Sequence, residues 1–248
     1  MFNVIDSAVP VACWACSVAH NESTLICPHC SKIQPPPGGD FFHVFGLERG
    51  FQVDLPKLEH EFHRLSRKVH PDRFARAGEN ERQWSLADTA LLNDAYRTLK
   101  DPLHRTEYLL KLEGAEIGEE HAGKDRKGQK DPSRVPADLL EEVFELNMQL
   151  EEMRAAHKMG EEEPQHHHPS GEDLPPGTPE LQADLERAKA KFEGMLGAVD
   201  VDLHVQWKMW DTGDADVRLA AQKTMVGLLD RRRYLSNLVR DVTETLGD

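Results

Sequence analysis

The chain has 248 residues, of which 39% are hydrophobic and 30% charged, and its formal net charge at pH 7 is −14. A chain this acidic is a poor candidate for general binding to nucleic acids or to anionic membrane surfaces. No apolar run approaches the ~20 residues needed to span a bilayer. The first twelve residues contain one Asp and no Lys or Arg, which matches neither a secretory signal nor a recognisable transit peptide.

The four cysteines all lie within the first 30 residues. Cys13 and Cys16 form one C-x-x-C pair, and Cys27 and Cys30 form a second pair ten residues later. Two such pairs can place four thiolates around one metal ion, which is the closed tetrahedral ligand set of a structural zinc site. The alternatives are redox dithiols, a disulfide staple and an iron centre. We therefore expect a small module over 1–39 that is held together by one zinc ion per chain.

The next part of the chain has the pattern of a small helical domain. Asp40 can cap a short, phenylalanine-rich helix, and Asp54 can cap an amphipathic helix over 55–69. Because Pro71 disfavours the helical conformation at His70, we expect the amphipathic helix to end there. Its apolar stripe consists of Leu55, Leu58, Phe62, Leu65 and Val69, at spacings of 3 and 4. Its opposite face carries Lys57, His60, Arg64, Arg67 and Lys68.

Two further helices are predicted from apolar residues with helical spacing over 84–99 and 103–112. Asp101-Pro102 separates them, and Gly114 ends the second.

The turn after the amphipathic helix carries a His and an Asp, which raises the question of catalysis. His70 and Asp72 could orient each other, but no nucleophile motif such as G-x-S-x-G accompanies them. The segment from His60 to His63 does not have the spacing of H-E-x-x-H, and neither a phosphate-binding loop nor G-x-G-x-x-G is present. We therefore predict no catalytic residue and no enzymatic activity.

The rest of the chain has the pattern of a helical bundle over 137–248. The segments 114–136 and 160–179 are charged or of low complexity, and we expect a linker and a mobile loop there. Helices are predicted over 137–158, 180–197 and 214–246, with a short helical piece over 204–210. The predicted fold class is therefore all-α.

A specific series of motifs runs through residues 40–113. It consists of Phe41-Phe42, the basic amphipathic helix, the HPDRF sequence from His70, the LNDAYRTL sequence from Leu92, and Asp101-Pro102. This order resembles the J domain of J-type co-chaperones. The fourth helix continues as RTEYLLKLEG, where ordinary J domains end in an Arg-x-x-Tyr-Asp pattern. With the helical bundle and the cysteine module, the chain resembles the HscB-type co-chaperones of iron–sulfur cluster biogenesis, in their eukaryotic tetracysteine form.

The resemblance implies a co-chaperone that stimulates ATP hydrolysis by a DnaK-type chaperone and delivers an IscU-type iron–sulfur scaffold protein to it. It assigns docking on the chaperone to His70, Pro71 and Asp72. The basic residues Arg64, Arg67 and Lys68 would steer the encounter with an acidic surface of the chaperone. The alternative is that these three residues form an ordinary solvated helix face. The family implies the mitochondrial matrix, with a cytosolic pool as the alternative.

The helix predicted from residue 137 carries two apolar stripes. The first is the expected bundle seam and consists of Leu139, Val143, Leu146, Leu150 and Met153. The second consists of Leu140, Phe144 and Met148, and one bundle cannot easily bury both. The resemblance implies that the scaffold protein binds Leu140, Phe144, Glu145 and Met148, together with Leu228 on the last helix. The alternative is that the second stripe packs on the J domain or on the helix over 103–112.

Two other functions stay open at this stage. The chain would be a J protein that delivers other clients, or a metalloenzyme or thiol–disulfide enzyme that uses the four cysteines. Neither a nucleic acid nor a membrane is expected as a partner, and formation of a homodimer is left open.

Overall fold

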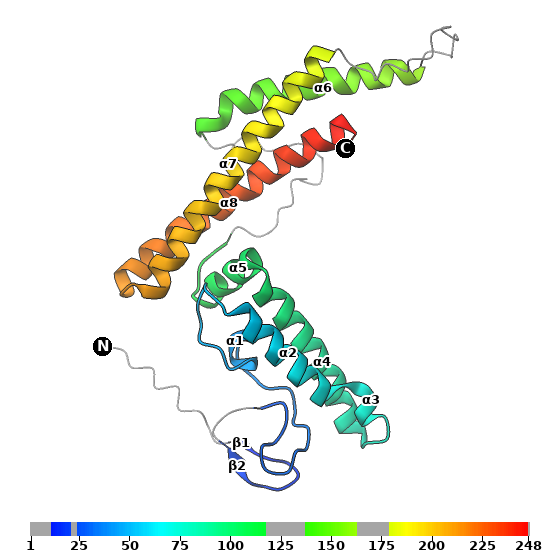
Figure 1. Ribbon diagram of the computed structural model, residues 1–248, viewed down its shortest axis with the longest axis vertical. Coiled ribbons are helices and arrows are strands. Elements are labelled where there is room, and N and C mark those ends of the chain that lie inside the picture. The colour runs from blue at the N-terminus through cyan, green and yellow to red at the C-terminus, as the bar shows by residue number, and fades with distance from the viewer. Residues whose placement is uncertain (1–10, 21–23, 118–136, 163–178, 248) are drawn as a thin grey trace. The chain divides into compact units, whose positions relative to one another are not determined.

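A computed structural model describes residues 11–20, 24–117, 137–162 and 179–247 (Figure 1). Contacts divide the chain into two compact units, Met1–Gly114 and Ala115–Asp248. The predicted all-α class is confirmed. Strands in the described part are limited to the antiparallel pair β1 (Val11–Ala12) and β2 (Ala19–His20) of the cysteine module. The finer domain boundaries remain a prediction. Most of the predicted linker and loop, 118–136 and 163–178, lies outside the described residues.

The first unit contains five helices within its described residues. They are α1 (Phe41–Val44), α2 (Leu55–Val69), α3 (Pro71–Phe74), α4 (Glu79–Lys100) and α5 (Pro102–Leu112). The predicted caps are present, because the Asp40 and Asp54 carboxylates accept hydrogen bonds from main-chain N–H groups in the first turns of α1 and α2. Asp101 caps α5 in the same way.

The core of the first unit lies between α2 and α4, which run side by side (Figure 1). Leu58 of α2 and Leu92 of α4 are fully buried, and the rings of Phe62 and Tyr96 stack with 4.2 Å between their centroids. The short helix α1 is held by its buried Phe42 and by the main-chain N–H of Phe41, which donates to the Tyr108 hydroxyl of α5 at 2.9 Å. Leu58, Phe62 and Val69 of the predicted apolar stripe therefore lie on the side of α2 that packs in the core, whereas Leu55, at the start of the helix, is 44% exposed.

The sequence does not predict the short helix α3. It begins at Pro71, whose fixed φ suits the first helical position, and the His70 ring Nδ1 accepts a hydrogen bond from the Asp72 N–H at 3.3 Å. The third predicted helix also begins earlier than expected, at Glu79. The Glu81 carboxylate accepts from the Gly78 N–H at 3.2 Å, which stabilises that earlier start.

The second unit consists, in its described part, of a 3-10 turn η2 (Ala137–Leu139) and three helices. These are α6 (Leu140–Glu162), α7 (Pro179–Thr212) and α8 (Ala215–Leu246). Helices α7 and α8 form a long antiparallel hairpin, and α6 lies against it (Figure 1). None of the described helices is both long and apolar enough to cross a membrane.

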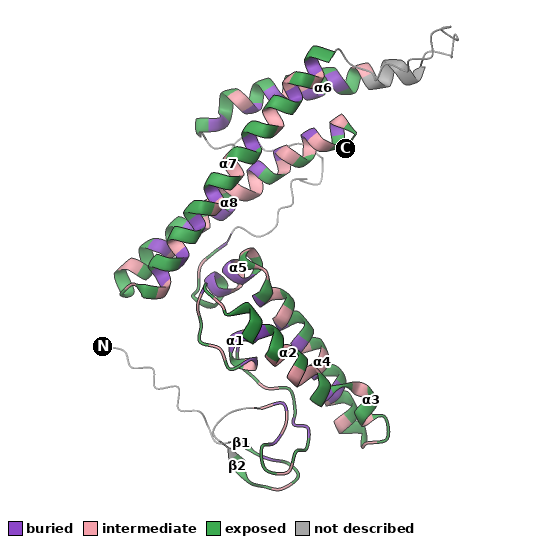
Figure 2. Cartoon of the chain, viewed as in Figure 1, coloured by how far each residue is buried: buried purple, intermediate pink, exposed green. Residues whose placement is uncertain are grey.

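The predicted end of a helix near Gly197 is wrong, because α7 continues without a break from Pro179 to Thr212. Its buried residues keep helical spacing on both sides of Gly197 and continue to Trp207 and Trp210. Figure 2 shows buried residues recurring along both α7 and α8. Packing of this continuous stripe outweighs the helix penalty of one exposed glycine, which is about 1 kcal/mol.

Candidate functional site

The four cysteine sulfurs lie within 4.8 Å of one another. The Sγ atoms of Cys13 and Cys30 are 3.6 Å apart, and those of Cys16 and Cys27 are 3.9 Å apart. Four sulfurs arranged tetrahedrally at ~2.3 Å from a zinc ion would be about 3.8 Å from one another. These two separations match a tetrahedral shell, and all four sulfurs are close enough together to share one metal ion.

The two C-x-x-C pairs adopt equivalent turns. Ser17 and Ser31 directly follow the second cysteine of each pair, and both have a positive φ, 59° and 57°. The N–H of Ser17 donates to the Cys13 carbonyl at 2.8 Å, and the N–H of Ser31 donates to the Cys27 carbonyl at 3.0 Å. This shared turn brings the two sulfurs of each pair to the same side of the backbone.

Backbone N–H groups also affect the thiol chemistry of the cluster. Burial raises the pKa of Cys13, but hydrogen bonds from the backbone of Cys16 and Ala15 and from neighbouring thiols outweigh it and lower that pKa to about 6. A backbone hydrogen bond from Lys32 lowers the pKa of Cys30, but burial and the other sulfurs together raise it to about 12. A divalent cation would deprotonate the thiols that coordinate it.

The His70-Pro71-Asp72 turn lies where α2 ends and α3 begins, with Pro71 and Asp72 in the first turn of α3. The side chain of His70 is 55% exposed and that of Asp72 is 90% exposed. The His70 Nδ1 lies 3.6 Å from the Asp72 Oδ2. Both groups are exposed and no nucleophile motif accompanies them, so the geometry favours a surface contact over a catalytic pair.

The predicted basic residues lie on α2, close to this turn. Arg64 is paired within its own helix, because its Nε and a terminal nitrogen contact the Glu61 carboxylate at 2.9 and 2.5 Å. The Arg64 hydrogen bond also lowers the pKa of Glu61. Arg67 and Lys68 are exposed in the last turn, and no carboxylate in the described part of the chain pairs with either side chain. The side chains of Arg67 and Lys68 are therefore available to a partner, whereas Arg64 is already paired with Glu61.

The exposed face of α6 carries the second apolar stripe. Leu140, Phe144 and Met148 are 51%, 67% and 54% exposed, and Glu145 beside them is also exposed. The residues of the predicted seam are all buried, namely Leu139 at the end of η2 and Val143, Leu146, Leu150 and Met153 of α6. The sequence-based division of α6 into a buried stripe and an exposed stripe therefore agrees with the structure.

Leu228 lies on α8 and is only partly exposed. One turn later, Arg231 donates two hydrogen bonds, of 3.0 and 2.8 Å, to the Asp138 carboxylate in η2. This bidentate pair holds the start of α6, including Leu140, against the segment of α8 that contains Leu228. The pair also raises the pKa of Arg231 and lowers that of Asp138.

Two residues that support the His-Pro-Asp turn and its domain escape prediction from the sequence. Ser85 of α4 donates from its hydroxyl to the Val69 carbonyl, directly before His70. Arg105 of α5 is buried and donates to the main-chain carbonyls of Phe51 and Leu99. A serine within a helix carries no distinguishing signal. A buried arginine could have been suspected only from its place on the apolar side of α5.

Comparison with known proteins finds relatives of this chain, although no protein-family model matches it. The chain is 38% identical to the iron–sulfur cluster co-chaperone protein HscB of Mus musculus and 36% identical to that of Homo sapiens. Each match extends over 153 residues and covers 60% of this chain and 61% of the relative. An HscB homologue of Vibrio cholerae is 46% identical over 81 residues, 33% of this chain and 47% of that protein.

Solved structures agree with these matches. The crystal structure of human co-chaperone protein HscB superposes with a TM-score of 0.61 at 25% identity and covers 94% of this chain and 98% of that one. The chaperone HscB from Vibrio cholerae gives a TM-score of 0.51 at 26% identity, with 83% and 96% covered. The chain, with its exposed His-Pro-Asp turn and its tetracysteine cluster, is therefore similar in sequence and in fold to HscB co-chaperones, and it spans about three fifths of the length of the curated relatives it matches.

Proposed function

We propose that this chain is a co-chaperone that stimulates the ATPase of a DnaK-type chaperone and delivers an IscU-type iron–sulfur scaffold protein to it. The observation that carries the proposal is the exposed His70-Pro71-Asp72 turn at the end of a basic helix. Arg67 and Lys68 at that end would steer the encounter with an acidic surface, while His70 and Asp72 dock. The chain itself performs no catalysis in this proposal, and the bond-breaking chemistry belongs to the chaperone.

The test is chaperone ATPase activity with and without this chain. We expect His70→Gln to abolish stimulation, because the glutamine side chain does not reproduce the imidazole at the tip of the turn. His60→Gln is the matched control, since His60 is also exposed on α2 but lies more than two turns before the His-Pro-Asp turn. Full stimulation by His70→Gln would refute the assignment, as would an equal loss in both variants.

The proposed client surface is the exposed stripe of α6 with Glu145, together with Leu228 of α8. Apolar side chains that remain this exposed beside a buried seam are typical of partner-binding sites. We expect Phe144→Ala to weaken binding of an IscU-type scaffold protein by at least roughly tenfold, with an unchanged helical circular dichroism signal.

The control for this surface is Leu112→Ala, which removes another exposed large apolar side chain, at the end of α5 in the first unit. If Phe144→Ala binds the scaffold as tightly as the parent chain, the stripe serves another purpose. A chain that stimulates the chaperone yet binds no scaffold would be a J protein for other clients.

We propose that the tetracysteine cluster binds one structural zinc ion through Cys13, Cys16, Cys27 and Cys30. The sulfur spacing supports this assignment, and a four-thiolate shell leaves no open position for catalysis. Metal analysis of the purified chain should give one zinc per chain, and Cys27→Ser should lower it. His29→Ala, a change of an exposed residue inside the second C-x-x-C pair, should not. Free thiols without zinc, or a bound iron, would contradict the assignment.

The proposed location is the mitochondrial matrix, which the eukaryotic form of the family implies. Import of the chain into isolated mitochondria tests it, and failure of import would contradict it.

A further inference from the structure

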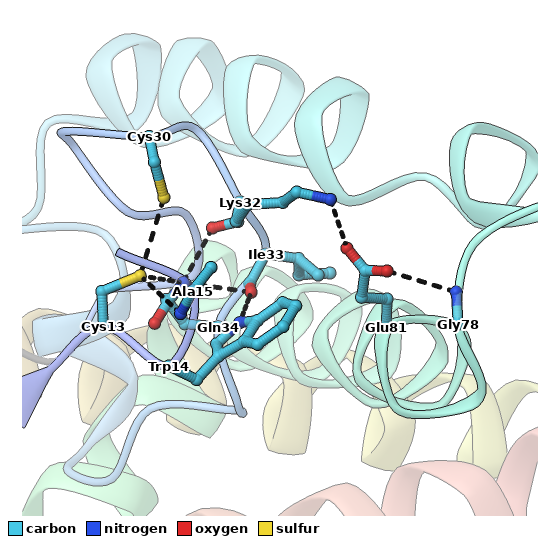
Figure 3. A network of polar contacts seen from close by, with 9 residues as sticks. All are labelled: Cys13, Trp14, Ala15, Cys30, Lys32, Ile33, Gln34, Gly78 and Glu81. Carbon is cyan, nitrogen blue, oxygen red and sulfur yellow. Dashed lines mark hydrogen bonds and ion pairs between the residues drawn. The ribbon is translucent and has the colours of Figure 1, made fainter. Parts of the chain in front are cut away.

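The cysteine module contacts α4 of the J domain at Trp14, which directly follows its first cysteine. The Trp14 ring meets the Trp84 ring of α4 edge to face, with 5.6 Å between centroids. The Trp14 indole N–H donates to the Ile33 carbonyl at 2.7 Å, which orients the ring within the module (Figure 3). An edge-to-face pair of this kind contributes beyond its buried area. The position of Trp14 therefore depends on the fold of the cysteine module, and the Trp14 ring is in direct contact with α4.

A second contact lies beside the fourth cysteine. The Lys32 ammonium pairs with the Glu81 carboxylate of α4 at 3.1 Å (Figure 3). The other oxygen of Glu81 accepts the N–H of Gly78, the residue before the first turn of α4. The hydrogen bond from Lys32 contributes most to the lowered pKa of Glu81. The module thereby holds the residue that caps the start of α4.

The first turns of α4 in turn hold the end of α2. Ser85, one turn after Glu81, donates from its hydroxyl to the Val69 carbonyl at 2.5 Å, and both Ser85 and Val69 are fully buried. Val69 directly precedes His70. A continuous set of contacts therefore runs from the cysteine cluster through Trp84 and Glu81 to the His-Pro-Asp turn.

We infer that the tetracysteine module acts as a metal-dependent brace, in which Trp14 and Lys32 position the His-Pro-Asp turn through the first turns of α4. Trp14 and Lys32 are the positioning residues. The inference goes beyond the proposed co-chaperone activity but rests on the proposed metal site. Without metal the module loses the bonds that hold its fold, and both contacts with α4 loosen. By thermodynamic linkage, changes in α4 that break these contacts must weaken metal binding by the same factor.

Amide hydrogen exchange of the full chain, followed by mass spectrometry, measures the first consequence. Removing zinc with a chelator should accelerate exchange of the amides in 79–85 and 69–74 by roughly tenfold, the effect of losing about one ion-paired hydrogen bond and one ring contact. The double variant Trp14→Ala/Lys32→Ala keeps all four cysteines. This double variant should show the faster amide exchange even with zinc bound, and the chelator should not accelerate its exchange further. Lys32→Arg should behave as the parent.

Zinc affinity, measured by competition with a chromophoric chelator, tests the reciprocal consequence. Trp84→Ala and Glu81→Gln change α4 and leave the module's sequence intact, and both should weaken zinc binding. Glu81→Gln keeps a side-chain oxygen for the Gly78 N–H, so the start of α4 retains its cap. Leu86→Ala, at an exposed position of the same helix, is the control.

The outcomes separate the two proposals. A chain that binds no zinc overturns the metal site and the brace together. A zinc-loaded chain whose exchange over 69–85 is unaffected by the chelator, and whose zinc affinity is the same in both α4 variants, overturns the brace and leaves the metal site standing.

Discussion

The Ser85 hydroxyl donates a 2.5 Å hydrogen bond to the main-chain carbonyl of Val69, the last residue of α2. The last carbonyls of a helix have no partner within that helix, so each needs another donor or water. Water does not reach this carbonyl, because Ser85 and Val69 are fully buried. One hydroxyl of α4 therefore stabilises the end of the basic helix, and His70 begins the turn from there.

Ser85→Ala should lower the free energy of unfolding of the chain by about 1–3 kcal/mol, because it leaves a buried carbonyl without a donor. Urea denaturation measures this. The control is Thr89→Ala, whose hydroxyl bonds a carbonyl within its own helix, and it should change stability by less than about 0.5 kcal/mol. Equal effects of the two substitutions would show that the bond to Val69 is unimportant.

Asp88 predicts an unusual pH dependence of stability. It is fully buried on α4, its carboxylate oxygens find no hydrogen-bond partner among the described residues, and burial raises its pKa to about 7. In the unfolded chain its pKa would be about 3.9. Between these values the folded state binds more protons than the unfolded state, so the contribution of Asp88 to stability falls as pH rises from about 4 to about 7.

The substitution that tests this is Asp88→Asn, which removes the titration and keeps the shape. The stability of the variant relative to the parent should rise across that pH window, by at most about 1.4 kcal/mol for each unit of pH. Urea denaturation of both chains from pH 4 to pH 8 provides the comparison. If the difference between the two chains does not change with pH, Asp88 is not buried as a neutral acid.

Arg105 should be essential to the J domain for structural reasons. Its guanidinium donates to the Phe51 carbonyl at 2.9 Å and to the Leu99 carbonyl, and its stem is buried. Arg105→Ala should cost roughly 2–5 kcal/mol, because two buried acceptors lose their donor and the stem leaves a void. Arg105→Lys should not restore the loss, since an ammonium lacks the planar fork. The exposed Arg97→Ala is the control, and thermal denaturation compares the three variants.

Two glycines of the α7–α8 hairpin should respond in opposite directions to alanine. Gly197 lies in the interior of α7, and a Cβ there would meet no atom within 4 Å. Gly197→Ala should stabilise the chain by about 0.5–1 kcal/mol through higher helix propensity. At Gly213 a Cβ would lie 2.5 Å from the Met209 carbonyl oxygen, so Gly213→Ala should destabilise it. Differential scanning calorimetry distinguishes these results, and a loss of stability in Gly197→Ala would contradict the continuous helix.

Local patterns in the sequence were sufficient for many of the elements. The caps at Asp40 and Asp54, the apolar stripe of α2 apart from the exposed Leu55, and the two stripes of α6 all depend on residues within a few positions of one another. The C-x-x-C pairs also predict one cluster, because each pair closes a local turn. Helix α3 was missed because a four-residue helix has too little periodicity to be recognised. The break expected at Gly197 was wrong because long-range packing against α8 holds α7 together.

By itself the sequence determined most of the helices, the cysteine cluster, the His-Pro-Asp turn and its resemblance to a family, because each depends on residue types at short spacings. Only the tertiary structure decided which side chains support that turn. The contacts of Lys32 with Glu81, Trp14 with Trp84 and Ser85 with Val69 join residues that are 49, 70 and 16 positions apart. No local pattern encodes such pairs, because they arise only when packing of the core brings separate segments together.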